Sequence, residues 1–171
     1  DSSEDETIDI AGSYCSGRSN FRFISLKDLP QASKGKKNAI QRGIENSKGD
    51  LIVTTDGDCR VPENWLKAIS AFYQSEKPKM ILAPVIFHSE KNIFQKIQSL
   101  EFTGLMGITE SSAVLNNPFI CNGANLAYER SAFESVGGFE NISGIASGDD
   151  TLLMHKLKEK FPCSVKYLSS D

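Results

Sequence analysis

A short apolar segment, residues 51–55, runs directly into Asp56, Gly57 and Asp58. An apolar run of this length is typical of a buried strand, and open α/β sheets bind ligands beyond the carboxyl ends of such strands. Two carboxylates one residue apart suit a hard divalent cation, which commonly takes a substrate phosphate as a further ligand. A turn rich in Gly and Asp that binds nothing is the alternative for the same residues. The chain is therefore expected to carry a candidate metal site at the end of a strand.

Strand-like and helix-like patterns alternate along the rest of the chain. Strands are expected over residues 21–26, 50–55, 80–87, 124–128 and 165–168, and helices over residues 4–14, 39–44, 62–72, 92–115, 131–136 and 149–160. Gly104 and Gly107 weaken the second half of the longest helix, so a break or bend is expected there. This alternation predicts an α/β fold with a mixed, mostly parallel sheet flanked by helices.

Composition narrows the classes of function. A net charge of −3 over 171 residues offers no basic field for nucleic acid. The longest nearly continuous apolar stretch, residues 80–87, is much shorter than the ~18 residues that a membrane span needs. The four cysteines lie far apart and form no C-x-x-C pair, which argues against a zinc site and for reduced thiols. These features indicate one globular domain that does not bind nucleic acid.

A second acidic pair, Asp149 and Asp150, follows the first by about 90 residues, directly after Gly148. The pair opens the helix expected over residues 149–160. Carboxylates at a helix N-terminus act as caps, which is one interpretation of the pair. A carboxylate with a like charge beside it can also have a raised pKa, which suits a general base. One acid can serve in both ways.

Glycines and a basic residue mark the regions around these acids. Residues 121–130 read C-N-G-A-N-L-A-Y-E-R, and Gly137 and Gly138 follow a short expected helix. Glycines on both sides of a short helix indicate tight turns near a bound ligand. Upstream, Lys36 opens a helix and could meet a diphosphate, although a solvated lysine is the commoner case.

Taken in order, the short motifs of this chain resemble those of the inverting family 2 glycosyltransferases. They read D-S-S-x-x-x-T, G-K-x-x-A-I-x-x-G, G-D-L-I-V-T-T-D-G-D, P-x-x-W-L, G-A-N-L-A-Y, V-G-G-F and G-D-D. Each motif is weak alone, but their order and spacing cover nearly all 171 residues. The resemblance implies a GT-A fold, the Rossmann-like fold of nucleotide-diphospho-sugar transferases.

The resemblance implies roles on the donor side. Asp58, with Asp56, would hold Mg²⁺ or Mn²⁺ on the diphosphate of a nucleotide-sugar, usually a UDP-sugar. Asp56 would face the ribose or the sugar. Asp1 matches the acid that reads the base, and Lys36 matches a basic position near the nucleotide.

It also implies roles on the acceptor side. Asp150 would be the general base that deprotonates an acceptor hydroxyl on a saccharide or a lipid-linked molecule. Asp149 stands where the family more often has Glu, which is a modest departure. Five further residues would line the donor-sugar and acceptor region: Asn122, Gly123, Asn125, Gly137 and Gly138.

The family's opening strand and helix are missing, so a fragment of a larger transferase is expected. Residues 1–60 would form its nucleotide-binding part and residues 61–171 its acceptor-binding part. Membrane attachment at the inner, cytoplasmic face of the cell membrane and a place in cell-envelope polysaccharide synthesis are expected of the larger protein. A missing strand exposes sheet edges, which favours a homodimer. Catalysis by the fragment itself is expected to be weak or absent.

Two other functions remain open. A phosphohydrolase could use Asp56 and Asp58 as nucleophile and acid, but it would favour Thr or Val where Cys59 stands. A non-catalytic module could bind a nucleotide-sugar or serve in assembly. Trp65 is expected in the core rather than against a sugar. Phe94 is expected in the core or on a partner-facing stripe that, if exposed, could touch a membrane.

Overall fold

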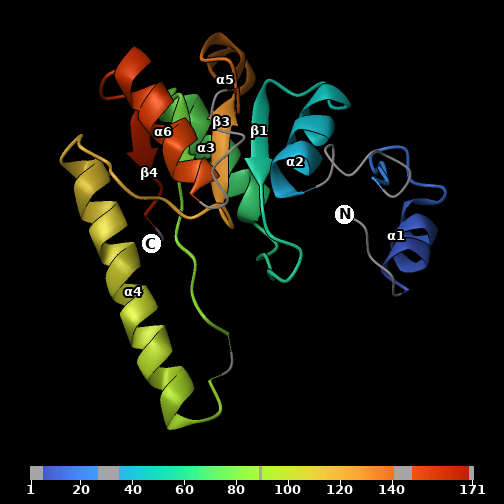
Figure 1. Cartoon of the computed structure of the whole chain (residues 1–171), viewed down its shortest axis with the longest axis horizontal. Coiled ribbons are helices and arrows are strands. Elements are labelled where there is room, and N and C mark those ends of the chain that lie inside the picture. The colour runs from blue at the N-terminus through green and yellow to red at the C-terminus, as the bar shows by residue number, and fades with distance from the viewer. Residues whose placement is uncertain (1–5, 27–34, 89, 141–147, 170–171) are drawn as a thin grey trace. The chain divides into compact units, whose positions relative to one another are not determined.

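The computed structural model describes residues 6–26, 35–88, 90–140 and 148–169. The chain divides into two compact units, residues 1–48 and 49–171. The first unit contains helices α1 (Thr7–Cys15) and α2 (Lys36–Glu45) (Figure 1). The strand predicted over residues 21–26 is wrong, because this segment is irregular. Its Phe21 ring packs edge-on against Tyr14 of α1, with ring centroids 5.2 Å apart.

The second unit is built on a four-stranded mixed sheet. Its strands are β1 (Leu51–Thr54), β2 (Met80–Leu82), β3 (Leu126–Glu129) and β4 (Val165–Tyr167), in the order β1-β3-β2-β4. β3 runs antiparallel to both β1 and β2, while β2 and β4 are parallel. Three strands therefore run in one direction, as expected of a mostly parallel sheet, and β3 is inserted between two of them in the opposite direction.

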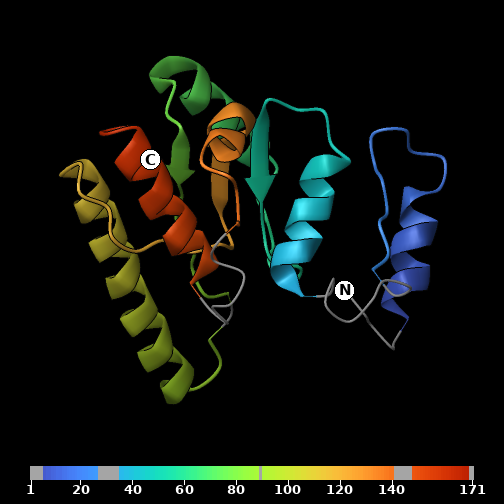
Figure 2. The ribbon, with the colours of Figure 1, turned by 45° about the horizontal axis from the view of Figure 1, so that its top comes forward.

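Helices cover both faces of this sheet (Figures 1 and 2). They are α3 (Trp65–Glu76), α4 (Ile93–Val114), α5 (Arg130–Ser135) and α6 (Asp149–Lys160). On one face, Ile69 of α3 packs in a buried cluster with Ile81 and Ala127. On the other face, the Tyr128 ring stacks on Phe133 of α5 at a centroid distance of 5.3 Å. Successive residues of a strand point to opposite faces, so Ala127 and Tyr128 separate the two layers.

Helix α4 is continuous over 22 residues, so the chain does not break at Gly104 or Gly107, and the alternative, a bend there, stays a prediction. Each glycine lowers the stability of a helix by roughly 1 kcal/mol relative to alanine, but both glycines keep helical geometry here. The Asn92 side chain caps the helix by accepting a hydrogen bond from the Gln95 amide at 2.9 Å. The first half of α4 extends away from the sheet (Figure 2), which leaves Phe94 65% exposed. Among the described residues, no helix is long and apolar enough to cross a membrane.

Three lysines in the second half of α6 donate hydrogen bonds to neighbouring segments. Lys156 Nζ donates to the Gly138 carbonyl at 2.7 Å, and Lys158 Nζ donates to the Pro118 carbonyl at 3.0 Å. Lys160 Nζ donates to the carbonyl of Ser135 at the end of α5. Cations near a helix C-terminus are also favoured by the helix dipole. The end of α6 that lies away from Asp150 is therefore fixed at several points.

Glu129 forms the centre of a polar cluster at the end of β3. Its carboxylate accepts from Lys79 Nζ at 2.7 Å, from the Tyr73 hydroxyl at 3.4 Å and from the Ser131 hydroxyl. Burial opposes ionisation, but the hydrogen bonds from Lys79 and Ser131 outweigh it and lower the pKa of Glu129. Because β3 pairs Glu129 with Leu51 at the start of β1, the cluster lies at the end of the sheet opposite to Asp56.

Glu129→Gln is expected to lower the free energy of unfolding by about 1–3 kcal/mol near neutral pH, because the charge-assisted hydrogen bonds are lost. The folded-state pKa of Glu129 is lowered, so its contribution is complete above the ordinary pKa of a glutamate. It disappears as the pH falls through the lowered value. Urea unfolding at several pH values should show the wild-type and variant curves converging in acid. The exposed Glu134 offers a control, and Glu134→Gln should change the free energy by less than about 0.5 kcal/mol. A gap that persists at the lowest pH would contradict this assignment.

Candidate active site

The register of the sheet brings the two central motifs to one edge. Thr54 at the end of β1 and Leu82 at the end of β2 both pair with Leu126 at the start of β3. The segment that enters β3 therefore begins where β1 and β2 end. Asp56, two residues past β1, and residues 122–125, just before β3, lie at this same edge.

Gly123 joins this edge to the start of α6. A Cβ atom on Gly123 would lie 1.9 Å from Oδ2 and 2.6 Å from Cγ of Asp150. The Asp150 carboxylate therefore rests directly on the Gly123 backbone, in space that only glycine leaves open. Thr54 Oγ1 reaches the Gly123 carbonyl at 3.5 Å. Gly123 is thus in contact both with the end of β1, two residues before Asp56, and with the start of α6.

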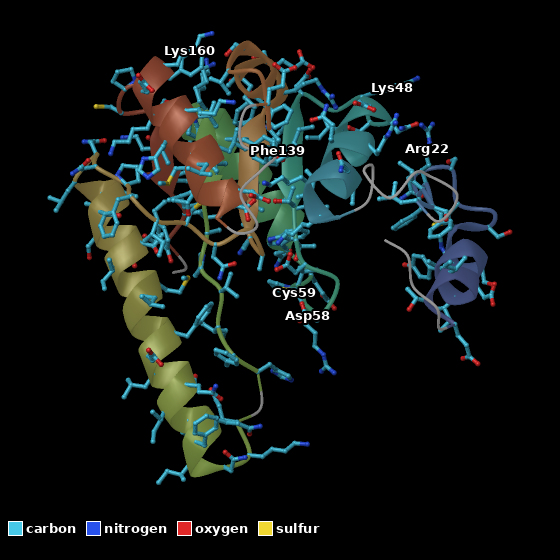
Figure 3. All side chains as sticks on the ribbon, in the orientation of Figure 1. Arg22, Lys48, Asp58, Cys59, Phe139 and Lys160 are labelled. Atoms are coloured by element: carbon cyan, nitrogen blue, oxygen red, sulfur yellow. The ribbon has the colours of Figure 1, made fainter. Side chains whose placement is uncertain are left out.

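Asp56 and Asp58 occupy the turn that follows β1, and Figure 3 shows Asp58 and Cys59 together on it. The Cys59 amide donates to the Asp56 carbonyl at 3.2 Å, which closes the turn. Asp56 is half-buried and Asp58 is exposed. Within the described ranges, no group of three or more His, Cys, Asp or Glu side chains could hold a metal. Two carboxylates fit a cation that shares its coordination with a phosphate, and they do not fit an all-protein cage.

Asn125 ties the site to the core. Its Oδ1 accepts from the Trp65 indole N–H at 2.9 Å, and its Nδ2 donates to the Pro84 carbonyl at 2.8 Å. Trp65 is partly buried against the cluster that contains Ile69 and Ile81, which confirms the prediction that it belongs to the core. Asn125 therefore fixes the entrance to β3 between α3 and the segment after β2.

The other small residues predicted near the site have local contacts of their own. Asn122 Oδ1 accepts from the Ala124 amide at 2.9 Å, which shapes the turn before β3. Gly137 and Gly138 have φ of +70° and +48° and end helix α5. A Cβ on Gly138 would lie 2.6 Å from the Phe133 ring. These glycines allow the chain to turn tightly at the end of α5.

Asp149 and Asp150 are the first two residues of α6, in a favourable position for negative charge. The N-cap position itself belongs to Gly148, which has a left-handed φ of +85° and no side chain with which to cap. Neither aspartate is therefore the N-cap residue itself. The start of the helix directs Asp150 onto Gly123.

Two side chains near Asp150 were missed by the sequence reasoning. Burial and the charge of Asp150 raise the pKa of Cys121 to about 12, although a hydrogen bond from Thr151 opposes this. Burial and the same charge raise the pKa of Tyr128. Both side chains are therefore neutral near pH 7, and the charge of Asp150 contributes to the pKa shift of each. Strand alternation could have placed Tyr128 on the face opposite Ala127, but no motif links either side chain to Asp150.

The structure does not test two of the predicted donor-side residues. Asp1 lies outside the described residues. Lys36 is the first residue of α2 in the first unit. Their predicted roles in nucleotide binding remain predictions.

Comparison with known proteins adds independent information. The family described as Glycosyl transferase family 2 matches residues 1–137 of the chain. The poly-beta-1,6-N-acetyl-D-glucosamine synthase of Staphylococcus aureus (strain COL) is 25% identical over 139 residues, which cover 80% of this chain and 32% of that protein. The beta-monoglucosyldiacylglycerol synthase of Trichormus variabilis (strain ATCC 29413 / PCC 7937) is 23% identical over 164 residues, which cover 95% of this chain and 35% of that protein. No solved structure matches the chain.

The chain spans about a third of the length of these curated relatives. The family match ends at residue 137, before Asp149 and Asp150, so the contact of Asp150 with Gly123 is an observation separate from that match. The match itself covers most of the chain, and the mixed α/β sheet agrees with the GT-A fold that it implies. The chain therefore belongs to glycosyl transferase family 2.

Proposed function

We propose that the protein transfers a sugar from a nucleotide-diphospho-sugar, with UDP as the expected nucleotide, to an acceptor hydroxyl with inversion at the anomeric carbon. The observation that carries this proposal is the contact between Asp150 and Gly123, at the edge where β1 leads into Asp56 and Asp58. A base and a diphosphate site must share one cleft in such a reaction. Membership of the family supplies the reaction class.

In the proposed reaction, Asp150 accepts the proton of the acceptor hydroxyl. The acceptor oxygen then forms a bond to the anomeric carbon on the face opposite the diphosphate. The bond between that carbon and the diphosphate oxygen breaks, and the nucleoside diphosphate leaves with the electron pair. Mg²⁺ or Mn²⁺ bound at Asp58 and Asp56 would neutralise the charge that develops on this leaving group. Because a single displacement occurs, the configuration is inverted.

The remaining predicted residues complete this proposal. Lys36 and Asp1 would bind the nucleotide, with Asp1 on the base. Asp149 would add negative charge beside Asp150. The wall of the donor-sugar and acceptor region would be formed by Asn122, Gly123, Asn125, Gly137 and Gly138, with Asn125 held in place by Trp65 and Pro84.

The acceptor class is proposed as a saccharide or a lipid-linked molecule. The name of one relative contains a poly-N-acetylglucosamine and that of the other a diacylglycerol. We place the intact protein in the cytoplasm at the inner face of the cell membrane. The exposed apolar side chains on the first half of α4, which include Ile93, Phe94, Ile97 and Leu100, support this placement. An exposed sheet edge would allow a homodimer.

A thermal-shift panel tests the donor class. UDP-, GDP- and dTDP-sugars are added with and without Mn²⁺, and one nucleotide is expected to stabilise the protein only when metal is present. At about 100 times the Kd, the melting temperature should rise by roughly 5 °C or more. Asp58→Asn should remove the metal-dependent rise, whereas Asp9→Asn, a change of an exposed aspartate on α1, should keep it.

The other outcomes point to the alternative functions. Stabilisation by a nucleotide-sugar without any turnover would indicate a binding or assembly module. Release of phosphate from a phosphomonoester would indicate a phosphohydrolase that uses Asp56 and Asp58. No response to any of these compounds would contradict the proposed donor.

A further inference from the structure

We propose that Trp65 is a positioning residue for Asp150. Its indole N–H holds the turn on which the Asp150 carboxylate rests in place beside the loop that carries the first acidic pair. The seat turn is residues 122–125, and the acidic loop is residues 55–64, between β1 and α3. This inference rests on the proposed function, in which Asp150 accepts the proton of the acceptor. Trp65 acts on the reaction through the seat turn and contacts neither donor nor acceptor.

The acidic loop is joined to the seat turn at both of its ends. Before the loop, Thr54 Oγ1 at the end of β1 reaches the Gly123 carbonyl at 3.5 Å. After the loop, the indole N–H of Trp65, the first residue of α3, donates to Asn125 Oδ1 at 2.9 Å. The first contact is long for a hydrogen bond and the second has a normal length. The Trp65–Asn125 bond is therefore the stronger of the two attachments.

Asn125 passes this attachment on to the rest of the seat turn. Its backbone amide reaches the Asn122 carbonyl at 3.5 Å across the turn, and its own carbonyl accepts from the Ala83 amide at 3.2 Å. Its Nδ2 donates to the Pro84 carbonyl at 2.8 Å. The two ends of the side-chain amide thus bind different segments, so the amide cannot rotate without breaking a hydrogen bond. The seat turn therefore keeps one orientation while Trp65 donates.

The position of the seat turn decides where the Asp150 carboxylate can lie. A Cβ atom on Gly123 would lie 1.9 Å from Oδ2 of Asp150, so the carboxylate packs directly on the backbone of the turn. A shift of the turn moves or releases this carboxylate. The same shift changes the spacing between the base and the acidic loop that carries Asp56 and Asp58. Displacement of a catalytic group by about 1 Å can cost roughly 10²-fold in rate.

The ring of Trp65 also packs in the core, so the variant must separate packing from hydrogen bonding. Trp65 is partly buried against the cluster that contains Ile69 and Ile81. Trp65→Phe keeps an aromatic ring against this cluster and removes the N–H. Tyr73→Phe is the matched control, because the Tyr73 hydroxyl donates to Glu129 Oε2 at 3.4 Å. It removes a hydrogen bond between the same helix and the opposite end of β3.

The test compares turnover with donor binding in the intact protein. Trp65→Phe is expected to lower kcat about tenfold and to keep the rise in melting temperature produced by UDP with Mn²⁺. Asn125→Ala, which removes the acceptor of the indole bond, should show the same split, and Tyr73→Phe should keep kcat. In the Asp150→Asn background, Trp65→Phe should change the residual rate by less than about twofold, because residues that act through one group have non-additive effects.

Wild-type kcat in Trp65→Phe, while Asp150→Asn is inactive, would overturn the role of Trp65 alone. An equal loss of rate in the wild-type and Asp150→Asn backgrounds would overturn it too, because Trp65 would then not act through the base. The same holds if Trp65→Phe loses the thermal shift with UDP and Mn²⁺, or if Tyr73→Phe lowers kcat as much. Failure of the proposed function looks different. In that case Asp150→Asn transfers sugar at the wild-type rate, or the wild-type protein transfers none, and the role of Trp65 falls with it.

Discussion

Asp150→Asn is expected to abolish sugar transfer and to leave binding of the nucleotide-sugar intact. Asparagine keeps the size of the side chain on Gly123, but it cannot accept the proton of the acceptor hydroxyl. Loss of a general base typically costs on the order of 10²–10⁴-fold in rate. Turnover of a radiolabelled donor by the intact protein measures the first effect, and the metal-dependent thermal shift measures the second.

Glu159→Gln provides the control for this change. Glu159 is an exposed acid at the far end of the same helix, so the variant removes one negative charge from α6 without touching Gly123. It should keep both transfer and binding. Transfer by Asp150→Asn at the wild-type rate would remove Asp150 from the mechanism.

Gly123→Ala is expected to impair transfer nearly as strongly, because the new methyl group would occupy the position of the Asp150 carboxylate. The Cβ would lie 1.9 Å from Oδ2. The atoms in conflict belong to the end of one side chain, so the fold should persist while the carboxylate moves. Displacement of a catalytic group by about 1 Å can cost roughly 10²-fold in rate. The rate of transfer and the melting temperature should be measured on the same samples.

Gly104→Ala is the matched control. Gly104 lies within α4, and a methyl group added there would meet no side chain or neighbouring segment within 4 Å. Ala in a helix is favoured over Gly by about 0.5–1 kcal/mol. This variant should melt slightly higher and transfer sugar at the wild-type rate. If Gly123→Ala were fully active, Asp150 would not need its present position.

The local parts of the site could be predicted from the sequence, since they depend on neighbouring residues. The apolar run before Asp56 became β1, and Asp149 opens α6 as expected. The segment 21–26 failed as a strand because its pattern does not alternate and Phe21 packs on α1 instead. A segment rich in apolar residues forms a strand only where a neighbouring strand is available to pair with it.

The arrangement around the base could not be predicted, because it depends on pairing between distant strands. The insertion of β3 between β1 and β2 sets Gly123 beside the end of β1. The same insertion sends Tyr128 to the face of α6. Asn125 is predicted to line the donor-sugar and acceptor region, but its side-chain contacts with Trp65 and Pro84 could not be predicted. Side-chain partners of this kind depend on the pairing register of the strands, which the periodicity of a single segment does not reveal.

The lysines along the second half of α6 have a mechanical consequence for the base. Lys156, Lys158 and Lys160 each donate a hydrogen bond to a carbonyl of a neighbouring segment, which opposes movement of the helix along its axis. Asp150 lies in the opposite, first turn, which follows Gly148. Any adjustment of its carboxylate to an acceptor hydroxyl would therefore take place within that first turn rather than by displacement of the whole helix.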